Sequence, residues 1–145
     1  MKKVFFLAII SFCFFTFGAA ESFACSCILD EETPVEIQIE KAHKGAAAVF
    51  SGEVVEITKE PDTFSIKVKL KIKKSWKSKL SDEVIITTAI NGGLCGYDFE
   101  VGEKYLIYAY GEKDSLRTDI CRRTALLSKT KDVAVLDKIK KAKKS

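Results

Sequence analysis

Histidine is nearly absent from this sequence: the 145 residues include only His43. A single histidine excludes the HExxH zinc-protease motif, which needs two, and the chain also lacks a GxSxG nucleophile elbow and a glycine-rich phosphate loop. Carboxylates are plentiful, but they form no recognisable catalytic pair. We therefore expect a protein that is not an enzyme and that has no cofactor and no metal site of its own.

Proline is also scarce, with two in the chain, and no linker or low-complexity stretch divides residues 25–145. A chain of this length has room for one globular domain, which we place at 25–145. The net charge of +4 falls to +3 when residues 1–24, with Lys2, Lys3 and Glu21, are removed. So mild a charge does not require a nucleic-acid partner.

An apolar run long enough to cross a membrane is missing as well. Residues 4–17 form a run of 14, broken only by Ser11 and Thr16, whereas a spanning helix needs roughly 18 or more. Lys2 and Lys3 precede the run and small residues follow it, which is typical of a cleaved signal peptide. We expect residues 1–24 to be this signal peptide and the mature form to have no transmembrane span. The expected location is secreted or extracytoplasmic, including the cell envelope or periplasm.

Two cleavage sites compete at the end of the signal peptide. A cut after Ala20 lies close to the apolar run, whereas a cut after Ala24 has better spacing and leaves Cys25 as the first residue. We favour Ala24–Cys25. A lipoprotein signal also places a cysteine first, but Ser22 stands where such signals usually have a Leu-like residue. The match to a lipoprotein signal is therefore poor, and we keep acylation of Cys25 as the alternative.

Four cysteines remain after Cys13 leaves with the signal peptide: Cys25, Cys27, Cys95 and Cys121. An even number in a small exported domain predicts two disulfides. A bond between Cys25 and Cys27 would be strained, so each must pair with one of the two distant cysteines. Both remaining patterns stay open at this point. A structural zinc site is disfavoured because the paired CxxC spacing is missing.

Hydrophobic periodicity predicts a helix, five strands and a second helix. The first helix starts at Thr33-Pro34 and ends near residues 45–47, with His43 in a surface or boundary position. Strands are predicted at 49–59, 64–72, 84–89, 104–110 and 116–120. Val133, Leu136 and Ile139 recur at helical spacing near the end. The pattern indicates a mainly β fold, with five antiparallel strands in a small closed or partly closed barrel.

The second predicted strand has a strict alternation of period two. Its apolar members, expected to point inward, are Phe64, Ile66, Val68, Leu70 and Ile72, and lysines at 67, 69, 71 and 73 are expected to point outward. Binding of single-stranded nucleic acid on such a face would need aromatic residues between the lysines. We interpret the lysine stripe as a solvated surface and expect no nucleic-acid partner.

The cysteines and several flanking segments together resemble the netrin-type module, in the version found in the tissue inhibitors of metalloproteinases. The matching segments are Cys25-Ser26-Cys27, Val49-Phe50-Ser51-Gly52, Cys95-Gly96-Tyr97-Asp98-Phe99, Tyr105-Leu106-Ile107-Tyr108-Ala109 and Thr118-Asp119-Ile120-Cys121. The resemblance covers residues 25–140. It implies an OB-fold-like five-stranded antiparallel barrel with one N-terminal and one C-terminal helix, and the pairing Cys25–Cys95 and Cys27–Cys121.

The resemblance also implies a function, metalloendopeptidase inhibition. The free amine and carbonyl of Cys25 would chelate the zinc of the protease, and Ser26, Cys27, Gly93 and Leu94 would contact the protease. The alternative is a non-inhibitory netrin-type module that binds proteins outside the cell or in its envelope, lipid-anchored if Cys25 is acylated. We expect a monomer whose partner is a zinc metalloendopeptidase or another extracellular protein.

Overall fold

The computed structural model of the chain describes residues 25–27, 32–90 and 94–143. The predicted signal peptide, its cleavage site after Ala24 and the predicted contact residue Gly93 lie outside these residues.

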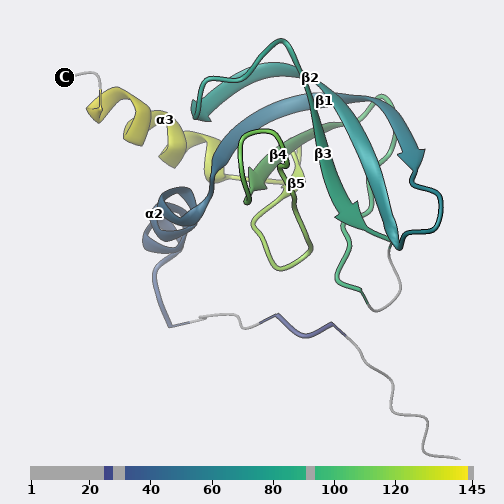
Figure 1. Ribbon diagram of the computed structural model, residues 1–145. Coiled ribbons are helices and arrows are strands. Elements are labelled where there is room, and N and C mark those ends of the chain that lie inside the picture. The colour runs from purple at the N-terminus through teal and green to yellow at the C-terminus, as the bar shows by residue number, and fades with distance from the viewer. Residues whose placement is uncertain (1–24, 28–31, 91–93, 144–145) are drawn as a thin grey trace, which may run out of the picture.

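Five strands pair antiparallel in one sheet, in the order β3-β2-β1-β4-β5. The elements are α2 (Val35–Gly45), β1 (Ala48–Lys59), β2 (Ser65–Lys77), β3 (Glu83–Ala89), β4 (Lys104–Ala109), β5 (Ala125–Leu126) and α3 (Asp132–Ala142). The sheet is strongly curved, and the two helices lie beside it on one side (Figure 1). The mainly β class, the five-stranded antiparallel sheet and the two flanking helices are therefore confirmed.

The prediction of a fifth strand at 116–120, however, is wrong. Among the described residues, this segment makes only isolated β-bridges. Arg117 forms a parallel bridge with Thr87 and an antiparallel bridge with Tyr110. It does not continue as a strand because the N–H of Ile120 bonds to the carbonyl of Cys95, 3.0 Å away. The strand that extends the sheet is β5, which pairs with Tyr105 and Leu106 of β4. The single bridges connect β3 to the end of β4, and a fully closed barrel stays a prediction.

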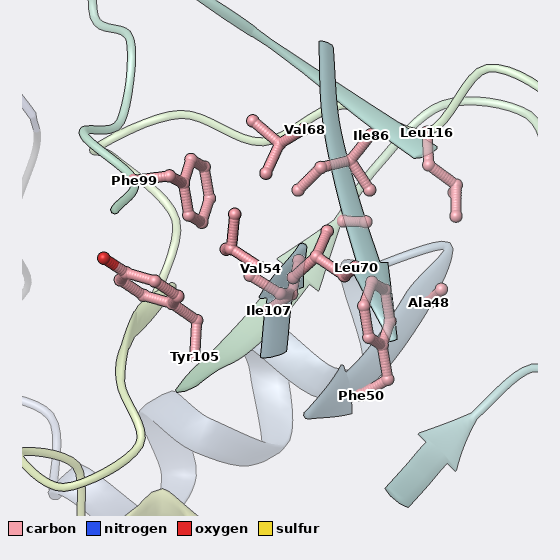
Figure 2. Close-up of a cluster of buried hydrophobic side chains, with 11 residues drawn as sticks. Ala48, Phe50, Val54, Val68, Leu70, Ile86, Phe99, Tyr105, Ile107 and Leu116 are labelled. Carbon is pink, nitrogen blue, oxygen red and sulfur yellow. The ribbon is translucent and has the colours of Figure 1, made fainter. Parts of the chain in front are cut away.

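Residues 48–54 of β1 and 105–109 of β4 are buried on both faces of the sheet, because alternate side chains enter two different apolar clusters. The first cluster lies between the strands (Figure 2) and includes Phe50, Val68, Leu70, Ile86 and Ile107. The second lies between the sheet and the helices and includes Ile39, Val49, Leu106, Tyr108 and Leu136. Burial on both faces explains why residues 48–50 and 105–109 are continuously apolar instead of alternating.

The alternation predicted for β2 holds in its centre and fails at its start. Val68 and Leu70 are fully buried, but Phe64 is 77% exposed and precedes the strand, which begins at Ser65. Phe64 belongs to the turn between β1 and β2, where the N–H of Glu60 bonds to the carbonyl of Ser65. The turn lies beyond the end of the apolar cluster, so an inward position is not available to Phe64.

The lysines of β2 point outward as predicted, and acidic residues neutralise several of them. The ion pairs are Lys67–Glu60 at 2.6 Å, Lys69–Glu83 at 2.7 Å and Lys73–Glu53 at 3.5 Å. Exposed pairs of this kind contribute little to stability. They do lower the positive potential that the lysine stripe would otherwise present to an anionic partner.

The two helices confirm the predicted segments to within a few residues. Helix α2 begins after Pro34, which is its N-cap residue, and α3 carries Asp132 in its first turn and Lys140 and Lys141 in its last. Those charges are favourable to the helix dipole. In the part of the chain that the structure describes, no helix has both the length and the apolar character needed to cross a membrane.

His43 is buried, which corrects the predicted surface or boundary position. Only 4% of the residue is exposed, and among the described residues its Nε2 atom has no hydrogen-bond partner. Burial lowers the pKa of His43, although a bond to the backbone of Trp76 opposes the change, and the nearby Lys143 and Lys77 lower the pKa further. The helical periodicity is misleading here because His43 bonds to the backbone of Trp76 in β2, a tertiary contact that a local pattern does not show.

The buried His43 should make stability depend on pH. Its folded-state pKa lies below the unfolded value of about 6.5, so the unfolded chain binds the proton more tightly. Stability contributed by neutral His43 is complete above about pH 6.5 and is lost as the pH falls toward the folded-state pKa. Urea unfolding between pH 7 and 5.5 should show this fall, with a slope of at most about 1.4 kcal/mol per pH unit. His43→Leu should remove most of the slope; an unchanged slope in that variant would assign it to other groups.

Candidate functional site

Two disulfides attach the segment Cys25-Ser26-Cys27 to distant parts of the chain. Cys25 bonds Cys95 across 70 residues and Cys27 bonds Cys121 across 94, with Cα–Cα distances of 5.3 and 5.1 Å. The prediction of two disulfides and the pairing implied by the resemblance are both confirmed. We call residues 25–27 the strap.

The two bonds lie side by side. The sulfurs of Cys25, Cys27 and Cys121 are within 4.8 Å of one another. Three close sulfurs would suit a metal ion if they were thiolates, but each of these is already bonded to a second sulfur. A disulfide sulfur carries no charge and is a poor zinc ligand. The cluster therefore fixes the backbone of the strap at two points only two residues apart.

The segment 95–97, which begins with Cys95, is itself rigidly placed. Cys95 has a φ of 61°, in the left-handed region that is uncommon for a residue with a side chain. The next residue, Gly96, lies so close to β3 that a Cβ atom there would be 1.8 Å from the carbonyl oxygen of Ala89. Next, the N–H of Tyr97 donates to Oγ1 of Thr88 over 2.9 Å. Only glycine fits at position 96, and the contact fixes where Cys95 meets the strap.

The loop that holds Cys121 is clamped at both ends by buried threonines. Thr118 donates from Oγ1 to the carbonyl of Tyr108 at 3.1 Å, and Oγ1 of Thr124 accepts the N–H of the same tyrosine at 3.0 Å. The two hydroxyls are 2.8 Å apart and share a further hydrogen bond. Within the loop, Oδ1 of Asp119 accepts the N–H of Cys121 at 2.9 Å. Cys121 therefore has little freedom to move.

A partly buried polar network supports the segment that the two threonines hold. Arg123 binds Asp132 at the start of α3 through two hydrogen bonds of 2.7 and 2.8 Å, and the hydroxyl of Tyr108 donates to the same carboxylate at 2.9 Å. Arg123 also reaches Oε1 of Gln38 on α2 at 3.2 Å. Burial and the negative charge of Asp132 raise the pKa of Tyr108, so its hydroxyl remains a donor. No local sequence pattern predicts this network, because its members come from four separate segments.

The strap presents one exposed residue between the two disulfides that anchor it. Ser26 is exposed, Cys25 and Cys27 are half-buried, and Leu94, next to the anchor Cys95, is 52% exposed. The Cys25–Cys95 bond thus brings Ser26 and Leu94, predicted as contact residues, into one surface region. Gly93 lies outside the described residues. The contact roles of these residues, and the cleavage that would free the amine of Cys25, stay predictions.

Removing the second anchor should loosen the strap and destabilise the domain. The double variant Cys27→Ser with Cys121→Ser should lose roughly 3 kcal/mol of unfolding free energy in urea, since the remaining bond already shortens the loop that the second one closes. Titration of thiols in denatured wild-type mature protein should find none. Unchanged stability, or a free thiol in the wild type, would contradict the two-disulfide structure.

Asp132 should be essential to the network under the Cys121 loop. Asp132→Ala leaves Arg123 without its carboxylate and Tyr108 without its acceptor, and we expect a loss of about 3 kcal/mol, typical of breaking a buried ion pair. Thermal or urea unfolding measures the loss. Asp82→Ala, at an exposed aspartate, is the matched control and should stay within about 0.5 kcal/mol of wild type. Equal stability of the two variants would show that the network is not needed.

No family model matches the chain, and no curated protein matches its sequence. The resemblance to the netrin-type module accordingly rests on the segments quoted above.

Proposed function

We propose that the mature protein is an extracytoplasmic inhibitor of a zinc metalloendopeptidase and acts through the backbone of Cys25. The observation that carries the proposal is the strap: three residues held by two adjacent disulfides, with Ser26 exposed between them. Disulfides of this kind are typical of an oxidising compartment outside the cytoplasm. The proposal requires cleavage of the bond between Ala24 and Cys25.

The chemistry of the strap suits an open zinc site. A catalytic zinc ion is held by three protein ligands and keeps a fourth position for water or substrate. A free α-amine has a pKa of about 7.7–8.0, so part of it is unprotonated near neutral pH and can ligate a metal. In a chain that begins at Cys25, the α-amine and the carbonyl oxygen of this residue would form a five-membered chelate and displace the water.

The two anchors also favour binding energetically. A flexible N-terminus would lose conformational freedom when it bound a protease, at a cost of roughly 1 kcal/mol or more per residue. The strap is already ordered by its bonds to Cys95 and Cys121, so that cost is met during folding and not during binding. Ser26 is small enough to enter a specificity pocket, and the exposed Leu94 extends the contact surface.

Blocking the α-amine should abolish inhibition while the fold stays intact. Cyanate near neutral pH carbamylates the α-amine before the lysines, whose pKa is about 10.4. The protein with one carbamyl group should lose at least about 100-fold in affinity for a susceptible zinc endopeptidase, roughly 3 kcal/mol, in an inhibition assay against a panel of such enzymes. Insertion of alanine between Ala24 and Cys25 should have the same effect.

Intact mass and circular dichroism confirm the N-terminus and the fold of each form. The exposed-surface variant Asp82→Ala, with a free amine, is the control that should inhibit normally. Inhibition that survives carbamylation would refute the chelation mechanism. If the unmodified protein inhibits none of the panel, a binding module without inhibitory activity becomes the better assignment.

A further inference from the structure

An open groove of about 720 Å³ lies on the outer side of β2 and β3. Its walls come from the turn between β1 and β2, from outward residues of β2 and β3, from Leu94 and from the segment 110–118. The mechanism proposed for the strap uses none of these walls except Leu94.

Three large apolar side chains from three separate parts of the chain are exposed in this groove. Phe64 is 77% exposed, Ile85 54% and Leu94 52%. Single exposed apolar residues are ordinary, but their convergence on one concave surface is typical of a binding site. The exposure of Phe64 is the feature that the alternation of β2 failed to predict.

The floor of the groove includes an open strand edge. Thr87 donates its N–H to the carbonyl of Leu116 at 2.9 Å and accepts the N–H of Thr118 at 3.1 Å. Alternation along β3 turns the N–H and C=O of Ile85 to the same edge. At Ile85 the neighbouring segment 112–115 turns away from β3, since the N–H of Ser115 bonds to the carbonyl of Glu112. Among the described residues, both backbone groups of Ile85 are without a partner.

The groove also contains an exposed cation, Arg117, whose charge acts on Glu60 and Tyr110 of the same groove. The guanidinium of Arg117 is exposed and makes no ion pair or hydrogen bond within the described ranges. Lys67, on the opposite wall, is already paired with Glu60 at 2.6 Å. Asp114 lies on the same wall as Arg117 but is not within ion-pair distance of it. Arg117 is thus the group available to an incoming carboxylate.

We propose that this groove binds an extended peptide segment of a partner protein by adding a strand to β3. The peptide backbone would bond to the N–H and C=O of Ile85, its apolar side chains would contact Phe64, Ile85 and Leu94, and an acidic side chain would pair with Arg117. Strand addition to an open edge is a common mode of peptide recognition, in which backbone bonds give affinity and side-chain contacts give specificity. The site does not depend on a free amine at Cys25.

Binding of a defined peptide to the mature protein tests the proposal. The probe is a fluorescent, acetylated hexapeptide of alternating threonine and valine that ends in glutamate, compared with the same peptide ending in lysine. Fluorescence anisotropy should give saturable binding of the glutamate peptide at least about tenfold tighter than of the lysine peptide. Hydrogen exchange should show that the amide of Ile85 becomes protected when the glutamate peptide binds.

Three variants locate the binding. Arg117→Glu should reverse the preference between the two peptides, and Phe64→Ser should weaken both about tenfold. Val101→Ser is the matched control, because Val101 is 62% exposed and does not line the groove; it should bind as the wild type does. Protein carbamylated at Cys25 should also bind the peptide normally, which separates this site from the inhibitory one.

Several results would overturn the proposal. These are the absence of binding by either peptide at millimolar concentration, equal binding by Phe64→Ser and the wild type, and loss of binding on carbamylation. Saturable binding of an oligosaccharide that Phe64→Ser abolishes, without binding of either peptide, would assign the groove to a different ligand class.

Discussion

The paired disulfides of the strap are the constraint on which the arrangement of the molecule depends. Cys25 and Cys27 are two residues apart, yet their partners Cys95 and Cys121 lie in loops that follow different strands. Both loops must therefore meet at one place. The close contact of Gly96 with Ala89 fixes the first loop, and the buried hydroxyls of Thr118 and Thr124 fix the second. The Ile120–Cys95 backbone bond then joins the two loops directly.

The sheet provides the rigid base that these loops need. β1 pairs with β2 on one edge and β4 on the other, and its register shifts let the sheet curve. Curvature places one set of side chains between the strands and leaves the other set for the helices, so residues 48–54 of β1 and 105–109 of β4 are buried on both faces. Asp132 connects this second layer to the Cys121 loop through Arg123 and Tyr108. The polar network is thus the link between the helices and the strap.

Much of this fold could be predicted from local pattern, and the remainder depends on tertiary contacts. The alternation around Val68 and Leu70 predicted β2, and the three-residue spacing of Val133 and Leu136 predicted α3, because each pattern follows the period of its element. β5 is too short to show a period. The predicted positions of His43 and Phe64 are wrong, because burial at the ends of elements depends on what packs against them. The number and spacing of the cysteines leave two disulfide pairings open, and the resemblance to the netrin-type module implies one of them.

The functional proposal adds one requirement to this structure, a free amine on Cys25. The fold places the strap on the surface and orders it whether or not that amine exists, so folding and inhibition are separate questions. The most direct test is the intact mass of the protein after export from its own full-length sequence. We expect a chain of residues 25–145 with two disulfides and no further modification. A mature chain that begins at Glu21, or one with an acyl group on Cys25, would contradict it.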